Sequence, residues 1–178
     1  MNIQTAIIKG AKILENKFFS SPYLDSEILM TKAINRNKKY ILINSNKKIE
    51  KKIFNLFQKL IEQRSKGKPI AYITKKKFFW DSEFVVSKDT LIPRPDTELL
   101  IDNILNLTKN KNDLNILDIG IGSGCILLSI LKERKHYRGT GIDISKNCIK
   151  ITKINAINLK IEQRLKLYQT NVDKFTLG

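Results

Sequence analysis

The sequence predicts an α/β protein in which a bundle of amphipathic helices is joined by a β-hairpin to a Rossmann-like domain with an incomplete parallel sheet. Three observations support this fold class. Apolar residues recur at helical spacing through about residue 66. A run rich in β-favouring residues follows between residues 70 and 95. From residue 113 onward, short apolar strands alternate with helical segments, which is typical of a parallel sheet.

The first part of the chain, residues 1–74, is expected to fold as a domain of three or four helices. One helix starts near Ile3, a second begins near Asp25, and segment 49–64 has the clearest amphipathic pattern. The apolar stripe of that last segment consists of Ile49, Ile53, Leu56, Phe57, Leu60 and Ile61. Helices that each bury one apolar stripe are stable only when packed together, so the pattern predicts a small bundle.

Residues 75–95 are predicted to form a hairpin that links the two parts. Two groups of β-favouring residues flank the pair Asp81-Ser82, where a turn is expected. Phe78, Phe79 and Trp80 are interpreted as the core of this hairpin rather than as a stacking platform for a ligand.

Residues 96–178 are predicted to hold the first half of the Rossmann-like domain. Asp96 or Thr97 is expected to cap its first helix. The elements that follow are expected at 113–119 (strand), 124–135 (helix), 138–143 (strand), 146–158 (helix) and 164–170 (strand). The first strand is central in such a fold. Without a fourth core strand it would therefore have an unpaired apolar edge that invites association.

A glycine-rich turn follows that first strand. The run Asp118–Gly124 reads D-I-G-I-G-S-G, so Gly120, Gly122 and Gly124 alternate directly before a helix. Glycine lets a ligand lie against the backbone, and the helix N-terminus offers free N–H groups. Nineteen residues after Gly124 the next strand ends at Asp143, whose carboxylate can accept two hydrogen bonds from a ribose diol. Together these features predict a nucleoside site.

Other site classes fit the sequence less well. The dinucleotide pattern G-x-G-x-x-G requires a glycine where Cys125 stands, and the Gly-Lys-Ser/Thr of a P-loop does not occur. Two cysteines outside a C-x-x-C pair and a single histidine, His136, are not the ligand set of a zinc site, so no metal is expected. No secretory signal or membrane-spanning run is evident. The two free cysteines suit a reducing cytoplasm, which is the expected location.

The chain is strongly basic, with 33 Lys and Arg against 17 Asp and Glu and a formal net charge of +16. One interpretation is attraction to RNA or to a partner seated on RNA. The other is a composition typical of an AT-biased genome, because Lys, Asn and Ile are all abundant. Direct nucleic-acid binding is therefore not predicted as the main role.

The glycine-rich turn resembles motif I of class I S-adenosylmethionine-dependent methyltransferases. Three upstream strings occur in the expected order: Gly67–Ile73 (G-K-P-I-A-Y-I), Phe78–Trp80 (F-F-W) and Leu91–Leu100 (L-I-P-R-P-D-T-E-L-L). In this order the strings resemble the release factor glutamine methyltransferase family (PrmC/HemK). The resemblance is strongest over residues 60–145 and looser elsewhere.

The resemblance implies S-adenosylmethionine as the cofactor and peptide-chain release factors as the partner, recognised by the N-terminal helices. The cofactor-binding residues it implies are Asp118, Gly120, Ile121, Gly122, Ser123, Gly124, Asp143, Asn171 and Val172. Asp118 would lie near the cofactor's amino group. Family members usually carry an acid near Asn171 and an aromatic residue at Val172, so the adenine contact is weakened here. Arg94 and Asp96 are candidates for the substrate side, although Arg94 could equally pair with Asp96 or Glu98.

The family transfers a methyl group to the amide nitrogen of the glutamine in a Gly-Gly-Gln motif. An amide nitrogen is a poor nucleophile, so a site must hold it in line with the methyl, about 3–3.5 Å away. Family members use an Asn-Pro-Pro-Tyr motif for this, and the motif does not occur in this chain. No catalytic residue is therefore assigned. The chain is expected to be a truncated or interrupted member that keeps the cofactor half.

Two other functions remain open. One is methylation of an amide or amino group on a ribosomal protein or a nucleic acid. The other is a non-catalytic remnant that binds a translation factor or the cofactor without turnover.

Overall fold

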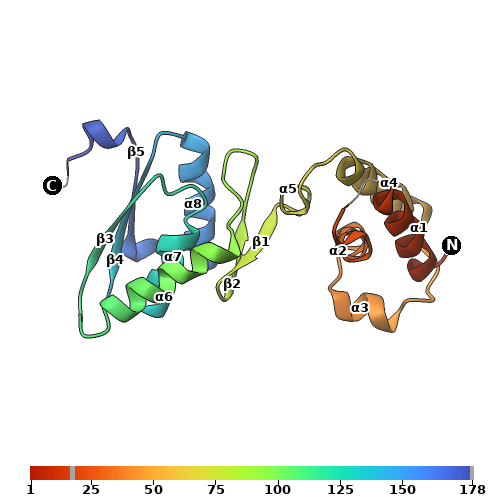
Figure 1. Ribbon diagram of the computed structural model, residues 1–178, viewed down its shortest axis with the longest axis horizontal. Coiled ribbons are helices and arrows are strands. Elements are labelled where there is room, and N and C mark those ends of the chain that lie inside the picture. The colour runs from red at the N-terminus through yellow and green to blue at the C-terminus, as the bar shows by residue number, and fades with distance from the viewer. Residues whose placement is uncertain (17–18, 177–178) are drawn as a thin grey trace. The chain divides into compact units, whose positions relative to one another are not determined.

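The named secondary-structure elements described in the first unit, Met1–Thr74, are all helices (Figure 1). The computed structural model describes residues 1–16 and 19–176. The helices of this unit are α1 (Ile3–Glu15), α2 (Pro22–Ile34), α3 (Lys38–Ile43), α4 (Lys51–Ser65) and α5 (Ile70–Thr74). Their apolar faces form one core, as the sequence pattern predicts, but the placement of Leu56 in the predicted stripe is wrong because its side chain is 44% exposed. Its most deeply buried side chains include Ile7, Leu14, Leu29, Met30, Ile41 and Phe57.

Two helix boundaries differ from the expected ones. Helix α2 begins at Pro22, one turn before Asp25, because proline is well suited to the first helical position, where no N–H is needed. Helix α5 lies within the predicted helical domain, at a position where no helix was singled out. The carbonyl of Pro69 accepts from the N–H of both Tyr72 and Ile73, and the buried Ile73 packs into the bundle core. Tertiary packing here overrides β-favouring composition.

An ion pair joins α2 to α4 inside the first unit. Arg64 Nε lies 2.7 Å from Asp25 Oδ2, and both side chains are largely shielded from solvent. The guanidinium also lies 3.8 Å from the centre of the Phe19 ring. The planar charge of arginine suits a carboxylate at its edge and an aromatic ring at its face at the same time. This contact therefore tethers α4 to α2.

The second unit, Lys75–Gly178, begins with an antiparallel hairpin of β1 (Lys76–Phe79) and β2 (Ser82–Val85). Residues 75–95, expected as a linker, are therefore part of this unit. Phe79 is buried and packs edge-to-face against the ring of Phe84. Phe78 was expected in the hairpin core, and this is wrong: its side chain is 67% exposed, because strand alternation turns it to the opposite face.

Trp80 is half-buried at the turn of the hairpin and has a positive φ of 55°. Its backbone N–H donates to Glu98 Oε1 at 2.8 Å, and its indole N–H donates to Glu133 Oε1 at 2.8 Å. These two bonds hold the turn against helices α6 (Glu98–Leu107) and α7 (Cys125–Glu133). The expected side-chain cap of α6 is absent from the described contacts, because a 3-10 turn, Pro95–Thr97, leads directly into the helix.

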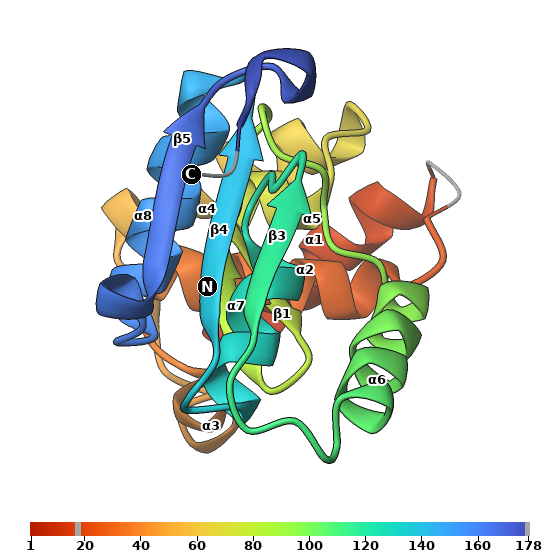
Figure 2. The ribbon, with the colours of Figure 1, turned by 90° about the vertical axis from the view of Figure 1, so that its left-hand side faces the viewer.

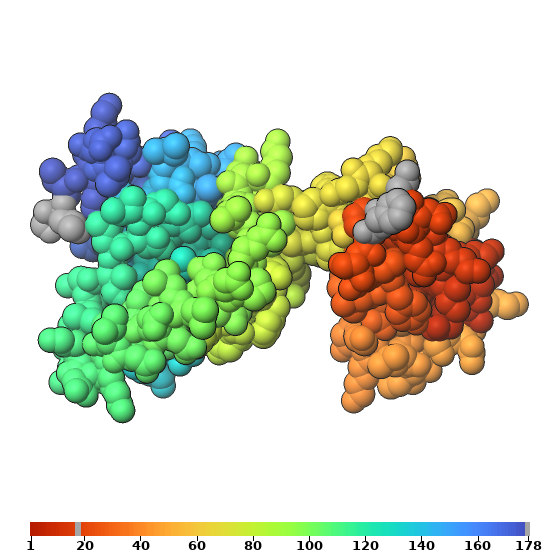
Figure 3. Space-filling view, viewed as in Figure 1, coloured from red at the N-terminus to blue at the C-terminus, as the bar shows by residue number. Residues whose placement is uncertain are grey.

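A three-stranded parallel sheet forms the centre of the second unit. Its order is β3 (Asn115–Ile119), β4 (Arg138–Asp143), β5 (Leu165–Gln169). Helices α7 and α8 (Lys146–Asn158) lie on one face of this sheet, as Figure 2 shows. Helix α6 lies at the surface of this unit (Figure 3). The strand and helix bounds predicted for residues 113–170 hold to within two residues at every end.

Strand β3 has a free edge, as expected from the incomplete sheet. Among residues 1–16 and 19–176, β3 pairs only with β4. Ile119 at its carboxyl end is 57% exposed, whereas Ile116 and Leu117 are half-buried. The free edge therefore carries an exposed apolar residue beside the glycine-rich turn. Within the same described residues, no helix is both long and apolar enough to cross a membrane.

Arg164 closes the carboxyl end of helix α7, a role the sequence pattern does not predict. Its guanidinium donates to the carbonyls of Leu131, Arg134 and Tyr137 at 2.7–3.0 Å. Cations are favourable beside the unpaired carbonyls at a helix C-terminus.

We expect Arg164→Met to lower the free energy of unfolding by about 2 kcal/mol, because it removes charge-assisted bonds but keeps the aliphatic stem. Urea unfolding measures the change. Arg138→Met, at an exposed arginine on β4, is the matched control and should change stability by less than about 0.5 kcal/mol. Equal effects of the two variants would contradict the assigned role.

Candidate functional site

The glycine-rich turn between β3 and α7 folds as an open cradle. Gly120, Gly122 and Gly124 all have positive φ, at 77°, 58° and 78°. A Cβ built on Gly120 meets no atom within 4 Å, and one on Gly122 meets only the carbonyl oxygen of Gly120, at 3.9 Å. Positive φ explains why glycine is needed, and the empty space beside it leaves the backbone accessible to a ligand.

The turn is tied to the end of strand β4. The N–H groups of Gly120 and Ile121 both donate to the carbonyl of Ile142, at 2.9 and 3.0 Å. The N–H of Gly124 closes the turn on the carbonyl of Ile121 at 2.8 Å. Main-chain hydrogen bonds within the protein therefore help to set the conformation of the turn.

Asp143 stands at the carboxyl end of β4, beside this turn. Its Oδ2 accepts from the N–H of Gly122 at 3.0 Å, and its Oδ1 accepts from the N–H of Ser145 at 2.8 Å. Each carboxylate oxygen can accept two hydrogen bonds, so one bond to each leaves capacity for a further donor. The sequence placed Asp143 near the turn by spacing, and the structure brings the two together. Ser145 also caps α8 as expected, accepting from the N–H of Cys148.

Two side chains of helix α8, neither of which was predicted as a site residue, donate hydrogen bonds to the turn. Thr152 Oγ1 donates to the carbonyl of Gly122 at 2.9 Å, and Asn155 Nδ2 donates to the carbonyl of Ser123 at 2.8 Å. Both side chains are buried. A polar pair at spacing i, i+3 on the buried face that also carries Ala156 was the available sequence signal.

Asp118 lies in β3 just before the turn and is mostly buried. Burial raises the pKa of its carboxyl group, the backbone N–H of Leu127 partly offsets this, and the charge of Asp143 raises the pKa further. Leu127 belongs to the first turn of α7, so the carboxylate faces the positive end of that helix. Among the residues that the structure describes, no cationic side chain lowers the pKa of this carboxyl group, so it is suited to receive a cationic group of a ligand.

The raised pKa of Asp118 sets the sign of a pH effect. The folded protein holds this proton to higher pH than the unfolded chain, so stability falls as pH rises above the ordinary value of 3.8 and through the folded pKa. We expect Asp118→Asn to raise the melting temperature at pH 7 and to weaken the binding of a cationic ligand about tenfold. Thermal scans from pH 3 to 8 should show the two proteins converging at the acid end. Asp102→Asn, at an exposed carboxylate of α6, is the control.

The other predicted cofactor residues, Asn171 and Val172, follow β5 at the same end of the sheet. The N–H of Thr170 donates to the carbonyl of Asp143 at 3.0 Å, so this loop begins beside Asp143. Asn171 Oδ1 accepts from the N–H of Asp173, and Val172 is 46% exposed. The structure therefore brings both residues to the end of the sheet that carries the turn.

Arg94 and Asp96, the substrate-side candidates, are exposed in the segment before α6. The ion pair considered between Arg94 and Asp96 or Glu98 is not among the contacts of the described residues, and Glu98 binds the N–H of Trp80 instead. Burial raises the pKa of the Cys125 thiol, which suits a packing residue rather than a nucleophile.

Two protein-family models match the chain. One, described as the PrmC N-terminal domain, matches residues 5–74, and the other, described as a methyltransferase small domain, matches residues 85–176. The chain belongs to the methyltransferase small domain family. Because the PrmC model precedes that domain, the resemblance to the release factor glutamine methyltransferase family is confirmed. The methyltransferase domain agrees with S-adenosylmethionine as the cofactor of this family.

Curated relatives carry matching names. The "Release factor glutamine methyltransferase" of Buchnera aphidicola subsp. Schizaphis graminum is 39% identical, covering 91% of this chain and 58% of the relative. The protein of the same name from Shewanella oneidensis is 36% identical, and the match covers 80% of this chain and 50% of the relative. A "Bifunctional methyltransferase" of Rickettsia bellii is 35% identical, and the match covers 96% of this chain and 35% of the relative. The chain thus spans about half the length of the two relatives named "Release factor glutamine methyltransferase".

Among solved structures, a "SAM-dependent methyltransferase from Geobacter sulfurreducens in complex with S-Adenosyl-L-homocysteine" is similar, with a TM-score of 0.40 and 21% identity. It covers 47% of this chain and 32% of that one.

Proposed function

We propose that this methyltransferase-family chain binds S-adenosylmethionine at the glycine-rich turn and Asp143. The observation that carries the proposal is the pair of bonds from Gly122 and Ser145 to the two carboxylate oxygens of Asp143. They place a hydrogen-bond acceptor at the rim of the open cradle, where a ribose diol would be held. Gly120 and Gly122 would support the methionine part of the cofactor, since no side chain fills the space beside them.

The further assignments follow the same geometry. Asp118 would receive the cofactor's amino group, because its largely buried carboxylate has no cationic partner within the described part of the chain. Ile121, Ser123 and Gly124 would contribute the remaining wall of the turn. Asn171 would offer its amide oxygen to the adenine. The cofactor supplies a methyl group already activated by its sulfonium, and these residues bind and orient it.

We further propose that the reaction is methylation of the glutamine side-chain amide in the Gly-Gly-Gln motif of peptide-chain release factors, in the cytoplasm. The names of the relatives from Buchnera and Shewanella support this substrate. The helical unit would recognise the release factor, and Arg94 and Asp96 would lie on the substrate side. Because the printed chain contains no Asn-Pro-Pro-Tyr, no residue is assigned to the amide chemistry itself.

Calorimetry with S-adenosylmethionine, S-adenosylhomocysteine and NAD tests the cofactor, and transfer of labelled methyl to a purified release factor tests the reaction. A release factor whose Gly-Gly-Gln glutamine is replaced by alanine is the control substrate. We expect binding of the first two ligands and not of NAD. Binding without transfer would favour the non-catalytic remnant, transfer to the alanine substrate would favour another methylated group, and NAD binding alone would overturn the assignment.

A further inference from the structure

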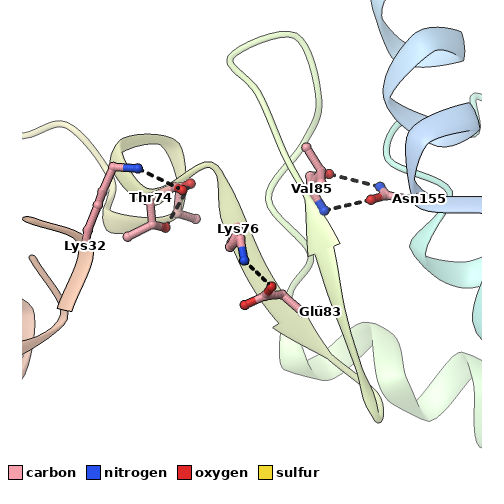
Figure 4. A network of polar contacts seen from close by, with 7 residues as sticks. Lys32, Thr74, Lys76, Glu83, Val85 and Asn155 are labelled. Carbon is pink, nitrogen blue, oxygen red and sulfur yellow. Dashed lines mark hydrogen bonds and ion pairs between the residues drawn. The ribbon is translucent and has the colours of Figure 1, made fainter. Parts of the chain in front are cut away.

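Asn155 connects two segments of the second unit that are far apart in the sequence. Its Oδ1 accepts from the N–H of Val85 at 2.7 Å, and its Nδ2 donates to the carbonyl of Val85 at 3.0 Å (Figure 4). The same Nδ2 donates to the carbonyl of Ser123 in the glycine-rich turn at 2.8 Å. One amide group thus bonds the last residue of β2 and the turn at once.

The amide is fully used in these contacts. It is 1% exposed, both of its N–H donors are engaged, and its oxygen accepts one bond. A buried amide with unmet hydrogen bonds is costly, so the three bonds are expected to form together or fail together. Movement of the turn would therefore also disturb the bonds between Asn155 and β2.

Helix α8 contacts the stretch after β2 at a second point. Cys148 Sγ lies 3.2 Å from the carbonyl of Asp89, two turns before Asn155 on the same helix. Residues 85–89 are thus attached to α8 at both ends. This stretch leads through Thr90 into the segment that carries Arg94 and Asp96.

We propose that Asn155 is a positioning residue that couples the glycine-rich turn to the hairpin, so that a ligand bound at the turn orders β2 and the stretch that follows. The inference rests on the proposed binding of S-adenosylmethionine at the turn. It assigns the hairpin a role in the response to cofactor, beyond its place in the core.

Thr152 provides a matched comparison for Asn155. It lies one turn earlier on α8, is equally buried, and donates to the neighbouring carbonyl of the turn, that of Gly122. Its hydroxyl has no bond to the hairpin among the contacts of the described residues. Thr152→Val therefore removes one bond to the turn and leaves the connection to Val85 intact.

The test is amide hydrogen exchange of the 178-residue chain with and without S-adenosylhomocysteine, read at Val85. In the parent we expect the ligand to slow exchange at Val85 about fivefold, the equivalent of one ordinary hydrogen bond. Asn155→Asp keeps the shape and the acceptor for the N–H of Val85 but loses both donors. Asn155→Ala removes all three bonds and serves if the aspartate variant does not fold. Both should abolish the response at Val85, whereas Thr152→Val should keep it.

The outcomes separate this inference from the proposed function. If the parent binds S-adenosylhomocysteine but exchange at Val85 does not change, the coupling is wrong and the cofactor assignment stands. The same holds if an Asn155 variant that binds the ligand responds as the parent does. If the parent binds no ligand, the proposed function fails and the inference fails with it.

Discussion

Asp143→Ala is expected to weaken the binding of S-adenosylmethionine by about 100-fold or more. The carboxylate is the acceptor proposed for both ribose hydroxyls, and hydrogen bonds to a charged group contribute about 1.5–3 kcal/mol each. Alanine removes these bonds and leaves nothing of similar shape in their place.

A second part of the expected loss of affinity comes from the glycine-rich turn itself. Asp143 accepts from the N–H groups of Gly122 and Ser145, so alanine leaves both donors without their present acceptor. Ser145 is also the N-cap of α8, whose side chains Thr152 and Asn155 hold the turn. Loss of the carboxylate is thus expected to loosen the turn as well as to remove the proposed contact with the sugar.

Calorimetry with S-adenosylhomocysteine measures this loss, and two further variants show its cause. Asp143→Asn keeps one acceptor oxygen but presents a donor in place of the other, so it should retain part of the affinity. Asp102→Ala removes an exposed carboxylate of α6 and should bind as the parent does. A dissociation constant for Asp143→Ala equal to that of the parent, in a folded protein, would contradict the proposed site.

Much of the second unit was predictable because its signals are local. Apolar strand residues, alternate glycines and the cap Ser145 lie within a few positions of the elements they specify, and the elements from β3 to β5 follow them closely. The spacing between Gly124 and Asp143 reflects the fixed lengths of one helix and one strand. A site formed by consecutive strand ends of a parallel sheet is therefore readable from sequence.

The residues that were missed act through contacts between distant segments. Asn155 reaches Val85 and Ser123, and Arg164 reaches the end of α7 from the 3-10 turn before β5. A polar residue on a helix and an arginine in a turn have many possible partners, and only the fold selects one. The exposed Phe78 was misplaced for a related reason, since the face a strand residue occupies depends on its pairing.

Gly141→Ala is expected to lower the free energy of unfolding by about 2–3 kcal/mol, although alanine ordinarily stabilises a position relative to glycine. A Cβ built at Gly141 lies 2.1 Å from Ile121 Cδ1 and 3.0 Å from Leu167 Cδ2. Strand β4 is paired on both sides, by β3 and β5, so its backbone cannot move away. Ile121 is 5% exposed and belongs to the glycine-rich turn. Relief of the clash must therefore move the buried side chain of Ile121, which belongs to the turn, so we expect ligand binding to weaken together with stability.

Ile121→Val tests this cause because it removes only the Cδ1 atom that meets the new methyl group. In urea unfolding, the loss of unfolding free energy in the double variant should be about 1 kcal/mol smaller than the sum of the losses in the two single variants. Gly139→Ala is the control on the same strand: its Cβ would lie 3.0 Å from side-chain atoms of Leu127 and Leu131 in α7, and Ile121 is not among its nearest atoms. It should lower stability but leave the affinity for S-adenosylhomocysteine nearly unchanged in the folded protein. If the effects of Gly141→Ala and Ile121→Val are strictly additive, the new methyl group does not clash with Ile121. The need for glycine at position 141 would then have a cause other than the turn.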